Sequence, residues 1–327
     1  MHVLILGGTG FLSRRICEDA IAAGHTVTCA ARGQLGMPPS GAAFAKWDRA
    51  TPPPAELVQL RPDAVIDVTS IPAYAESAVA LWPKAHWIYI STVSVYSDLS
   101  RPGGTVLDTP LLSPLNDGDP RVNPDDYGSM KVACENYVRQ GTASSLILRP
   151  GLIVGPRDRS GRFAYWPSHA AAAAIDGDGL LVPGQPADPV QFIDVGDLSR
   201  WVVRTFDDRM EGCFDAIGPS MSWADFMTGL GHGVGAHIQP VYASPEWLTD
   251  HGVVEWVGQR SLPLWVADLA SAGMLARDAT AALGAGLVTR PIADTVSDTL
   301  AWLSSTPDAP VTGLTRAEER ALLEALR

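Results

Sequence analysis

A tyrosine and a lysine, Tyr127 and Lys131, stand four residues apart in the run Asp-Asp-Tyr-Gly-Ser-Met-Lys. On a helix, positions i and i+4 lie on one face, so a phenol and an ammonium at this spacing can reach one site. A nearby ammonium favours the phenolate, so we expect Lys131 to lower the pKa of Tyr127 from its usual value of about 10. The pair therefore predicts a proton donor or acceptor at neutral pH, with an ordinary surface pair as the alternative.

A glycine-rich turn, Gly-Gly-Thr-Gly-Phe-Leu at residues 7–12, lies between an apolar run at 2–6 and an amphipathic stretch at 11–23. In this strand–turn–helix setting, Gly7 permits a tight turn and Gly10 lets the backbone approach a pyrophosphate at the helix N-terminus. The third small position of the motif is Ser13, which keeps helix and strand close. The turn predicts dinucleotide binding, and a turn without any nucleotide is the alternative.

The residues after the second strand indicate which dinucleotide would bind. Enzymes that use NAD often place a carboxylate there, which accepts a hydrogen bond from the ribose 2′-hydroxyl. This chain has Cys-Ala-Ala-Arg-Gly at 29–33, so Arg32 could instead hold a 2′-phosphate. We expect NADP, with NAD as the alternative. Asp48, after the third strand, would accept from the adenine amino group or simply cap a turn.

Strands and helices alternate around these residues, which predicts an α/β fold of the Rossmann type, with a doubly wound parallel sheet. We expect a dinucleotide-binding domain at 1–155, joined by a returning strand and helix near 189–207, and a smaller, irregular substrate-binding part at 156–327. The expected strands are 2–6, 25–30, 43–47, 64–68, 87–91, 145–148 and 190–192. The expected helices of the first domain are 11–23, 55–60, 73–82 and 126–140, and the Pro- and Gly-rich stretch 97–126 reads as a long loop.

The composition disfavours several classes of binding partner. A net charge of −12 over 327 residues disfavours nucleic acid and anionic membranes, which reward a basic surface. The four cysteines show no metal-binding spacing, so we expect free thiols and no metal. No basic leader precedes the first strand, and no apolar run reaches the roughly 18 residues of a membrane helix, so we expect a cytoplasmic protein. A small-molecule substrate is expected, and a homodimer could form.

Five motifs occur here in the order and spacing of one family. They are Gly-Gly-Thr-Gly-Phe-Leu (7–12), Ile-Ser-Thr-Val-Ser-Val-Tyr (90–96), Tyr127-x-x-x-Lys131, Leu-Arg-Pro-Gly-Leu-Ile-Val-Gly-Pro (148–156) and Gln-Phe-Ile-Asp-Val-Gly-Asp-Leu (191–198). Over its first 200 residues the chain resembles the extended short-chain dehydrogenase/reductase group, also called the NAD-dependent epimerase/dehydratase family. The resemblance implies a catalytic set of Thr92, Tyr127 and Lys131. Thr92 would hydrogen-bond the substrate oxygen, Tyr127 would transfer a proton, and Lys131 would bind the nicotinamide ribose. The cofactor-binding residues expected from turn and resemblance together are Gly7, Thr9, Gly10, Phe11, Leu12, Arg32, Asp48, Thr69, Lys131 and Pro150.

One departure from the family bears on the substrate. Relatives acting on sugar nucleotides commonly place an arginine on the substrate diphosphate where this chain has Val190. Valine cannot pair with phosphate, although Arg157, Arg159, Arg162 or Arg260 could substitute. Tryptophans are frequent in the C-terminal part, and they would form core or, less often, face a flat substrate. We therefore expect an NADP-dependent oxidoreductase that reduces a carbonyl, or an equivalent polarised double bond, of a small molecule. The alternatives are a sugar-nucleotide epimerase or dehydratase and a non-catalytic nucleotide-binding scaffold or sensor.

Overall fold

The computed structural model describes residues 1–327, and its centre is a parallel sheet of seven strands. In chain order the strands are β1 (His2–Leu6), β2 (Thr26–Ala31), β3 (Ala43–Lys46), β4 (Ala64–Asp67), β5 (His86–Ile90), β6 (Ser144–Pro150) and β11 (Gly212–Ala216). They lie side by side in the order β11-β6-β5-β4-β1-β2-β3, and every neighbouring pair is parallel. The order reverses direction at β1, as in a doubly wound fold. The predicted fold class is confirmed.

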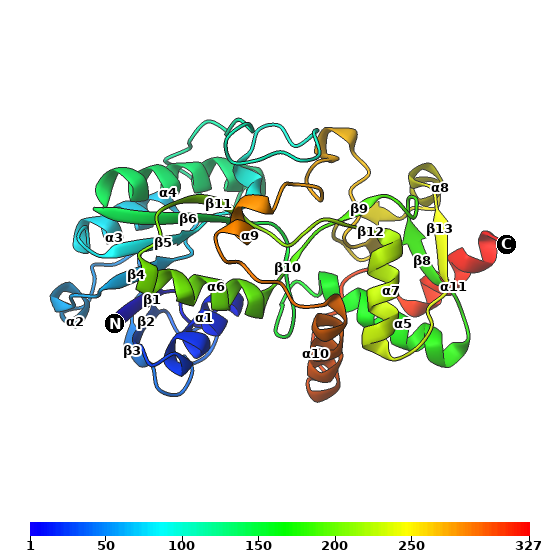
Figure 1. The fold of residues 1–327 in the computed structure, drawn as a ribbon, viewed down its shortest axis with the longest axis horizontal. Helices are drawn as coiled ribbons and strands as arrows, with labels where there is room; N and C mark the ends of the chain where they lie inside the picture. Colours follow the sequence, from blue (N-terminus) through cyan, green and yellow to red (C-terminus); the bar gives the residue numbers. More distant parts are fainter.

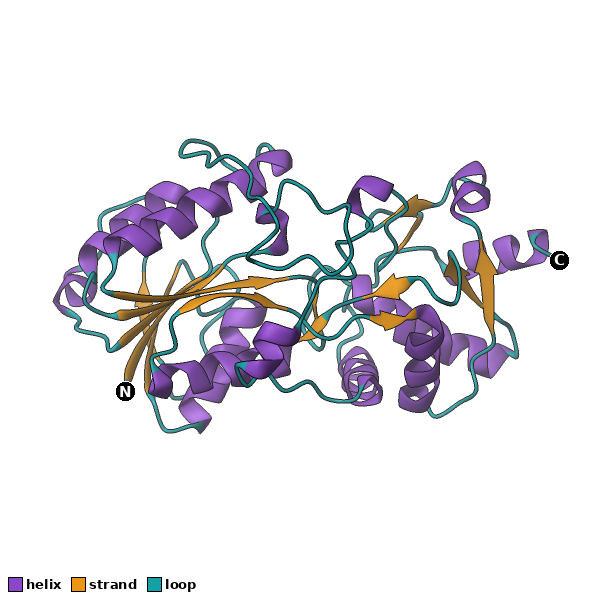
Figure 2. Cartoon of the chain, turned by 45° about the horizontal axis from the view of Figure 1, so that its top comes forward, coloured by secondary structure: helices purple, strands orange, loops and turns teal.

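Both faces of the sheet are covered by helices, which explains why its strands read as continuous apolar runs. In β1, Val3 and Ile5 enter one buried cluster, and Leu4 and Leu6 enter the cluster on the opposite face. The first face carries α1 (Phe11–Ala22) and α6 (Val195–Asp208). The second carries α3 (Pro72–Leu81) and α4 (Tyr127–Gly141), with the short α2 (Ala55–Gln59) beside them. Figures 1 and 2 show these two helical layers on either side of the sheet.

The predicted seventh strand is wrong in position. Residues 190–192 do not join the central sheet. Instead, β9 (Pro189–Val190) pairs antiparallel with β12 (Met221–Ser222), and β10 (Ile193–Asp194) pairs with β7 (Ile153–Val154). The seventh place is taken by β11, which pairs with β6. The sequence of β11, Gly-Cys-Phe-Asp-Ala, does not read as a buried strand because it contains a carboxylate. Asp215 is buried there because it makes an ion pair with Arg277.

The C-terminal part has its own apolar core of 26 buried residues. Its helices are α5 (Arg162–Asp176), α7 (Trp223–Val234), α8 (Pro245–Asp250), α10 (Ile292–Ser305) and α11 (Arg316–Ala325), and α9 (Thr280–Gly284) lies beside β11 (Figure 1). The short strands β8 (Leu180–Pro183) and β13 (Pro240–Ala243) are paired, as are β14 (Val254–Glu255) and β15 (Ser261–Leu262). Trp166, Trp223 and Trp265 are buried in this core, as favoured from sequence, whereas Trp247 and Trp256 pack against it and are only partly buried.

The stretch 97–126 is the long loop that the sequence predicts. It contains a single β-bridge, between Tyr96 and Leu111, and a short 3₁₀ turn at Pro124–Asp126 that leads into α4. The loop therefore joins the end of β5 to the residue that begins the Tyr127 helix. None of the helices combines the length and the apolar character that crossing a membrane would require.

Candidate active site

The turn between β1 and α1 brings backbone, and almost no side chain, to the end of the sheet. Gly7 has a φ of +93°, which strongly favours glycine. At Gly8 an added Cβ would lie 2.4 Å from the Sγ of Cys29, so only glycine fits there. Ser13, at the third small position of the motif, donates its hydroxyl to the carbonyl of Gly7 at 2.6 Å. Ser13 therefore stabilises the turn with a hydrogen bond, whereas the sequence suggested only that its side chain is small enough to fit.

A cavity of about 290 Å³ opens beside this turn, at the ends of β1, β2, β3 and β4. Five of the predicted cofactor-binding residues line it, namely Gly7, Thr9, Arg32, Asp48 and Thr69. The other five do not. Gly10 caps α1, Phe11 and Leu12 form its first turn with Leu12 buried in the core, and Pro150 is the last residue of β6. Lys131 lies on α4, at the ends of β4 and β5, with its side chain bonded to their carbonyl groups. The cavity therefore gathers the predicted residues of the glycine-rich turn and of the ends of β2, β3 and β4, and their role in binding a cofactor stays a prediction.

Two exposed charged residues, Arg32 and Asp48, lie at the rim of this cavity and differ in whether they have a hydrogen-bond partner. Arg32 is exposed and forms no ion pair. Asp48 is exposed as well. Its Oδ1 accepts from the backbone N–H of Ala50 at 3.1 Å, so Asp48 caps a turn, which was the alternative to binding adenine. Asp48 keeps its second carboxylate oxygen free of any protein partner. The rim therefore presents one free guanidinium and one partly engaged carboxylate.

The sequence reasoning missed Arg49, which forms a wall of the cavity. Its guanidinium makes two hydrogen bonds, of 2.8 and 2.9 Å, to the buried carboxylate of Asp67, and it also donates to the carbonyl of Tyr74. It lies over the rings of Trp47 and Tyr74, at 5.8 and 5.5 Å from their centres. The available signal was Asp67 itself, because a carboxylate at the end of an apolar strand requires a cationic partner.

The three predicted catalytic residues come from two elements that meet at the end of the sheet. Thr92 follows β5 and caps the short 3₁₀ turn Val93–Val95, where its Oγ1 accepts from the N–H of Ser94 at 3.1 Å. Tyr127 is the first residue of α4, which packs against that 3₁₀ turn, and the Thr92 side chain influences the pKa of its phenol. Lys131 follows one turn later on the same helix. The structure therefore brings these residues together, while their catalytic roles stay a prediction.

The expected direction of the Tyr127 pKa is wrong for this structure. Burial raises the pKa of Tyr127, and hydrogen bonding from Thr92 opposes that rise. Lys131 is itself buried, which lowers its pKa to about 8. Its Nζ donates to the carbonyl of Ile90 at 2.6 Å and to that of Val68 at 3.2 Å, and it lies 4.7 Å from the ring centre of Tyr89. The ammonium is therefore engaged by the strand ends, and the half-buried phenol of Tyr127 keeps its proton.

A buried polar network supports these residues, and sequence reasoning did not foresee it. Glu135, one turn after Lys131, makes hydrogen bonds of 2.9 and 2.7 Å with Arg149 of β6 and one of 2.6 Å with Ser91, the neighbour of Thr92. Arg149 also donates to the hydroxyl of Tyr96, which donates to Asp215. The carboxylate of Asp215 is in turn held by Arg277 at 2.6 Å. Since these links join β5, α4, β6 and β11, they fix where Thr92 and Lys131 stand.

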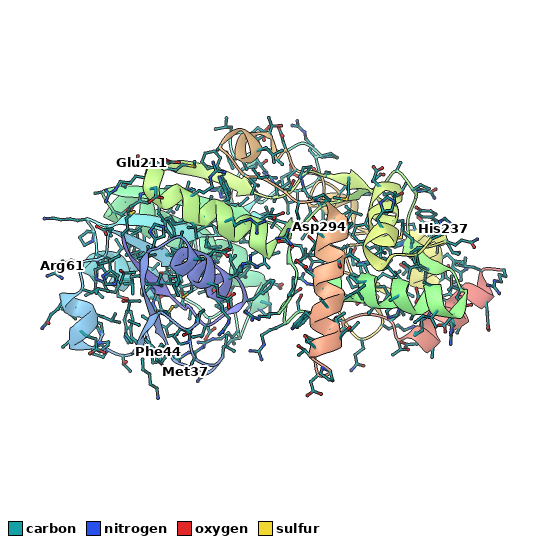
Figure 3. The ribbon with its side chains drawn as sticks, turned by 60° about the horizontal axis from the view of Figure 1, so that its bottom comes forward. Met37, Phe44, Arg61, Glu211, His237 and Asp294 are labelled. Atoms are coloured by element: carbon teal, nitrogen blue, oxygen red, sulfur yellow. The ribbon has the colours of Figure 1, made fainter.

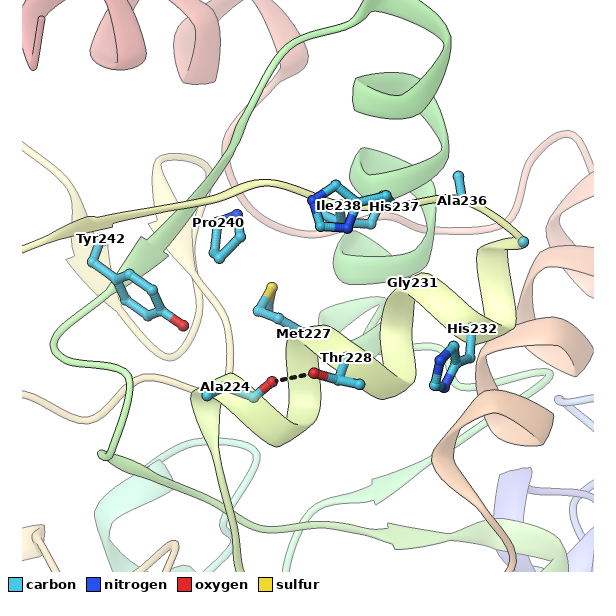
Figure 4. Close-up of a pocket in the computed structure, with 11 residues that line it drawn as sticks. Ala224, Met227, Thr228, Gly231, His232, Ala236, His237, Ile238, Pro240 and Tyr242 are labelled. Atoms are coloured by element: carbon cyan, nitrogen blue, oxygen red, sulfur yellow. Dashed lines mark hydrogen bonds between the residues drawn. The ribbon is translucent and has the colours of Figure 1, made fainter.

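A larger cavity, of about 720 Å³, lies elsewhere in the molecule, between α7 and the segment that leads into β13. Figure 4 shows Met227, His232 and Tyr242 on its walls, with the hydroxyl of Thr228 bonded to the carbonyl of Ala224. His237 also lines it, and Figure 3 places His237 at the opposite end of the protein from Phe44 of β3. None of the predicted catalytic or cofactor-binding residues contributes to this cavity, so it is separate from the candidate site.

Two characterised enzymes are similar to this chain in sequence, although no family model matches it. The 2′-dehydrokanamycin reductase of Streptomyces kanamyceticus is 26% identical in an alignment of 264 positions, which covers 76% of this chain and 71% of the relative. The dTDP-6-deoxy-L-talose 4-dehydrogenase (NAD(P)⁺) of Kitasatospora kifunensis is 28% identical in an alignment of 243 positions, which covers 64% of this chain and 70% of the relative. Both relatives are oxidoreductases by name.

Solved structures share the fold over nearly the whole chain. The Bordetella bronchiseptica enzyme WbmH, determined in complex with NAD⁺, superposes with a TM-score of 0.62 at 18% identity and covers 93% of this chain and 99% of its own. The UDP-N-acetylglucosamine 4-epimerase of Bacillus cereus superposes with a TM-score of 0.63 at 17% identity and covers 95% and 99%. The resemblance predicted from the five motifs is thereby confirmed, and this chain has the fold of the extended short-chain dehydrogenase/reductase, or NAD-dependent epimerase/dehydratase, family.

Proposed function

We propose that this protein is an NAD(P)-dependent oxidoreductase of the short-chain dehydrogenase/reductase type, acting on a carbonyl group of a small molecule. The observation that carries the proposal is the meeting of Thr92, Tyr127 and Lys131 at the strand ends, near a cavity beneath the glycine-rich turn. Both similar enzymes, a reductase and a dehydrogenase by name, agree with this class of reaction. Reduction of an equivalent polarised double bond uses the same groups.

The residues present fit a dinucleotide. Gly7, Gly8 and Gly10 carry no side chain that would cover the backbone of the turn, and the N–H groups at the start of α1 favour an anion there. Thr9, Arg32, Asp48 and Thr69 would hold the adenosine half in the cavity. When bound, the nicotinamide supplies or accepts the hydride. Lys131 would turn from the carbonyl of Val68 toward the nicotinamide ribose.

The proton in this scheme is carried by Tyr127. Because burial raises its pKa, the phenol holds its proton at neutral pH and can donate it to a carbonyl oxygen as that oxygen gains charge. Thr92 would hold the same oxygen with its hydroxyl. A neutral donor of this kind suits reduction, in which the substrate oxygen takes up a proton.

We propose NADP(H) as the preferred cofactor, because Arg32 is unpaired and no carboxylate ends β2. The preference is measured from the dissociation constants of NADPH and NADH. Arg32→Ala should weaken NADPH by about 10-fold or more, the usual effect of a lost charge-assisted contact, and leave NADH nearly unchanged. Equal binding of the two cofactors by the wild type would refute the preference.

For the substrate we propose a ketone on a sugar or amino-sugar ring that carries no nucleotide. Val190 is fully buried in the C-terminal core, so its position offers nothing to a diphosphate. One similar enzyme is a 2′-dehydrokanamycin reductase by name, and a net charge of −12 suits cationic substrates. The names of the epimerase structures and of the dTDP-sugar dehydrogenase favour a second candidate, a sugar-nucleotide epimerase or dehydratase with the same three residues.

The experiment that tests the reaction follows NADPH oxidation with a panel of keto-sugars and compares the wild type with Tyr127→Phe. The ring still packs in the variant while the hydroxyl is gone, so cofactor affinity should hold and turnover should fall by about 10²- to 10⁴-fold. A variant with nearly wild-type turnover would show that another group carries the proton. Titration of UDP- and dTDP-sugars into the NADP-loaded protein separates the two candidates, because micromolar binding would favour the epimerase.

A further inference from the structure

The long loop between β5 and α4 reaches the cavity beside the glycine-rich turn, which is called the nucleotide cavity below because the proposed cofactor would bind there. Pro120 and Arg121 line that cavity together with Arg32 and Asp48, although more than seventy residues separate them in the chain. The turn that carries Arg121 is well formed, since the carbonyl of Asp119 accepts from the N–H groups of Val122 and Asn123. A 3₁₀ turn and then Tyr127 follow directly. The loop thus connects the adenosine end of the site to the catalytic helix.

Of the two arginines at this cavity that form ion pairs, Arg49 and Arg121, only Arg121 has a partner that an anionic ligand could replace. Arg49 is held by the buried carboxylate of Asp67 and is therefore committed to the fold. Arg121 is bonded only to Asp119, two residues away, with Nε at 2.7 and 2.9 Å from its two oxygens. Its side chain is 61% exposed. An exposed pair of this kind contributes little stability, so a stronger anion can displace Asp119 at small cost.

A ribose 2′-phosphate is such an anion. It carries nearly two negative charges at neutral pH, and a guanidinium binds it through two parallel hydrogen bonds. Arg32 alone would be balanced by the exposed carboxylate of Asp48 on the same rim, which leaves no net positive charge for the phosphate. A second guanidinium adds a positive charge to the rim, because Arg121 lines the cavity and the Asp119 that it would leave does not. The 2′-hydroxyl of NAD, being uncharged, would leave Arg121 on Asp119.

We propose that Arg121 is a second 2′-phosphate-binding residue, which exchanges Asp119 for the phosphate and so fastens the 97–126 loop over NADP(H). The proposal rests on the cofactor assigned above. Arg121 stands six residues before Tyr127, so the same exchange couples recognition of the phosphate to the placement of the proton donor. NADP(H) then differs from NAD(H) in two ways, because it binds more tightly and it also orders the approach to α4.

The test uses two fragments of the cofactor, adenosine 2′,5′-bisphosphate and 5′-AMP, which differ only in the 2′-phosphate. Calorimetric titration compares the wild type with Arg121→Gln and with Arg101→Gln, an exposed arginine of the same loop that does not line the cavity. Arg121→Gln should weaken the bisphosphate, and NADPH, by about 10-fold or more, and 5′-AMP and NADH by less than about twofold. Arg101→Gln should leave all four ligands nearly unchanged.

Hydrogen exchange of the loop gives a second, independent readout. NADPH should slow exchange of the amides at 119–123 in the wild type, and NADH should do so much less. Equal losses of bisphosphate and 5′-AMP affinity in Arg121→Gln, or no loss at all, would overturn the proposal. The measurements involve no turnover. A protein that binds NADPH through Arg121 but reduces no carbonyl would therefore refute the proposed function and leave this inference intact.

Discussion

Replacement of Glu135 by glutamine tests whether the buried network positions the candidate site. Glu135 is fully buried and accepts from Arg149, Arg139 and Ser91, while the side chain of Arg149 is only 3% exposed. Glutamine keeps the shape but removes the charge, and one of its two terminal atoms can no longer accept from a guanidinium. Loss of one partner from a buried ion pair costs about 3–5 kcal/mol, so we expect Glu135→Gln to be destabilised by that amount.

The assay is urea unfolding at neutral pH, followed by the same measurement in acid. Burial would raise the pKa of Glu135, but Arg149 outweighs burial and the pKa is lowered. A carboxylate whose folded pKa is depressed stabilises the protein above its unfolded pKa of about 4.3, and that stability is lost as pH falls through the folded pKa. The gap between wild type and Glu135→Gln should therefore narrow in acid.

Two further variants separate the ion pair from the packing. Arg139→Gln removes an exposed partner of Glu135 and should cost less than about 1 kcal/mol. Replacing both Glu135 and Arg149 by methionine removes both buried charges, so the double variant should be more stable than Glu135→Gln. Turnover of Glu135→Gln should also fall, because Ser91 and α4 hold Thr92 and Lys131. A Glu135→Gln protein within about 1 kcal/mol of the wild type, with unchanged turnover, would refute this reasoning.

Three other outcomes are expected. The pKa of Lys131 is depressed from 10.5 to about 8. Between about pH 8 and 10 the unfolded chain therefore binds a proton that the folded chain does not. In urea unfolding, the free energy of unfolding of the wild type, relative to that of Lys131→Met, should rise by roughly 3 kcal/mol over this pH range. A rise of the same size in Lys131→Met would assign the effect to other groups. Thr92→Val should lower turnover and leave the NADPH dissociation constant nearly unchanged, and a matching loss of cofactor affinity would contradict its role toward the substrate. Gly8→Ala should lower the free energy of unfolding by about 1–3 kcal/mol, an amount typical of overpacking, since its Cβ would lie 2.4 Å from Cys29 Sγ. Gly284→Ala, whose Cβ would meet no atom within 4 Å, should leave the free energy of unfolding nearly unchanged.

Much of the fold could be predicted from local patterns alone. The continuous apolar run of β1, the glycine turn and the amphipathic helix after it identify a βαβ unit, because a parallel strand buried on both faces needs apolar residues at every position. The five motifs likewise predicted which family the fold would match. The Tyr127 and Lys131 spacing placed both residues on one helix, since the geometry of a helix is set within a single turn.

The tertiary structure decided what depends on distant partners. The seventh strand is β11 and not 190–192, because Asp215 becomes acceptable within a strand only when Arg277 and Tyr96 reach it. The pKa of Tyr127 is raised and not lowered, because the phenol is removed from solvent and the Lys131 ammonium is bonded to the carbonyl of Ile90. The spacing of the two residues in the sequence reveals neither fact. Arg49 and Arg121 line the nucleotide cavity only after β3, β4 and the 97–126 loop have come together. Local spacing specifies elements and motifs, whereas charge, burial and cavity walls arise from contacts between residues far apart in the chain.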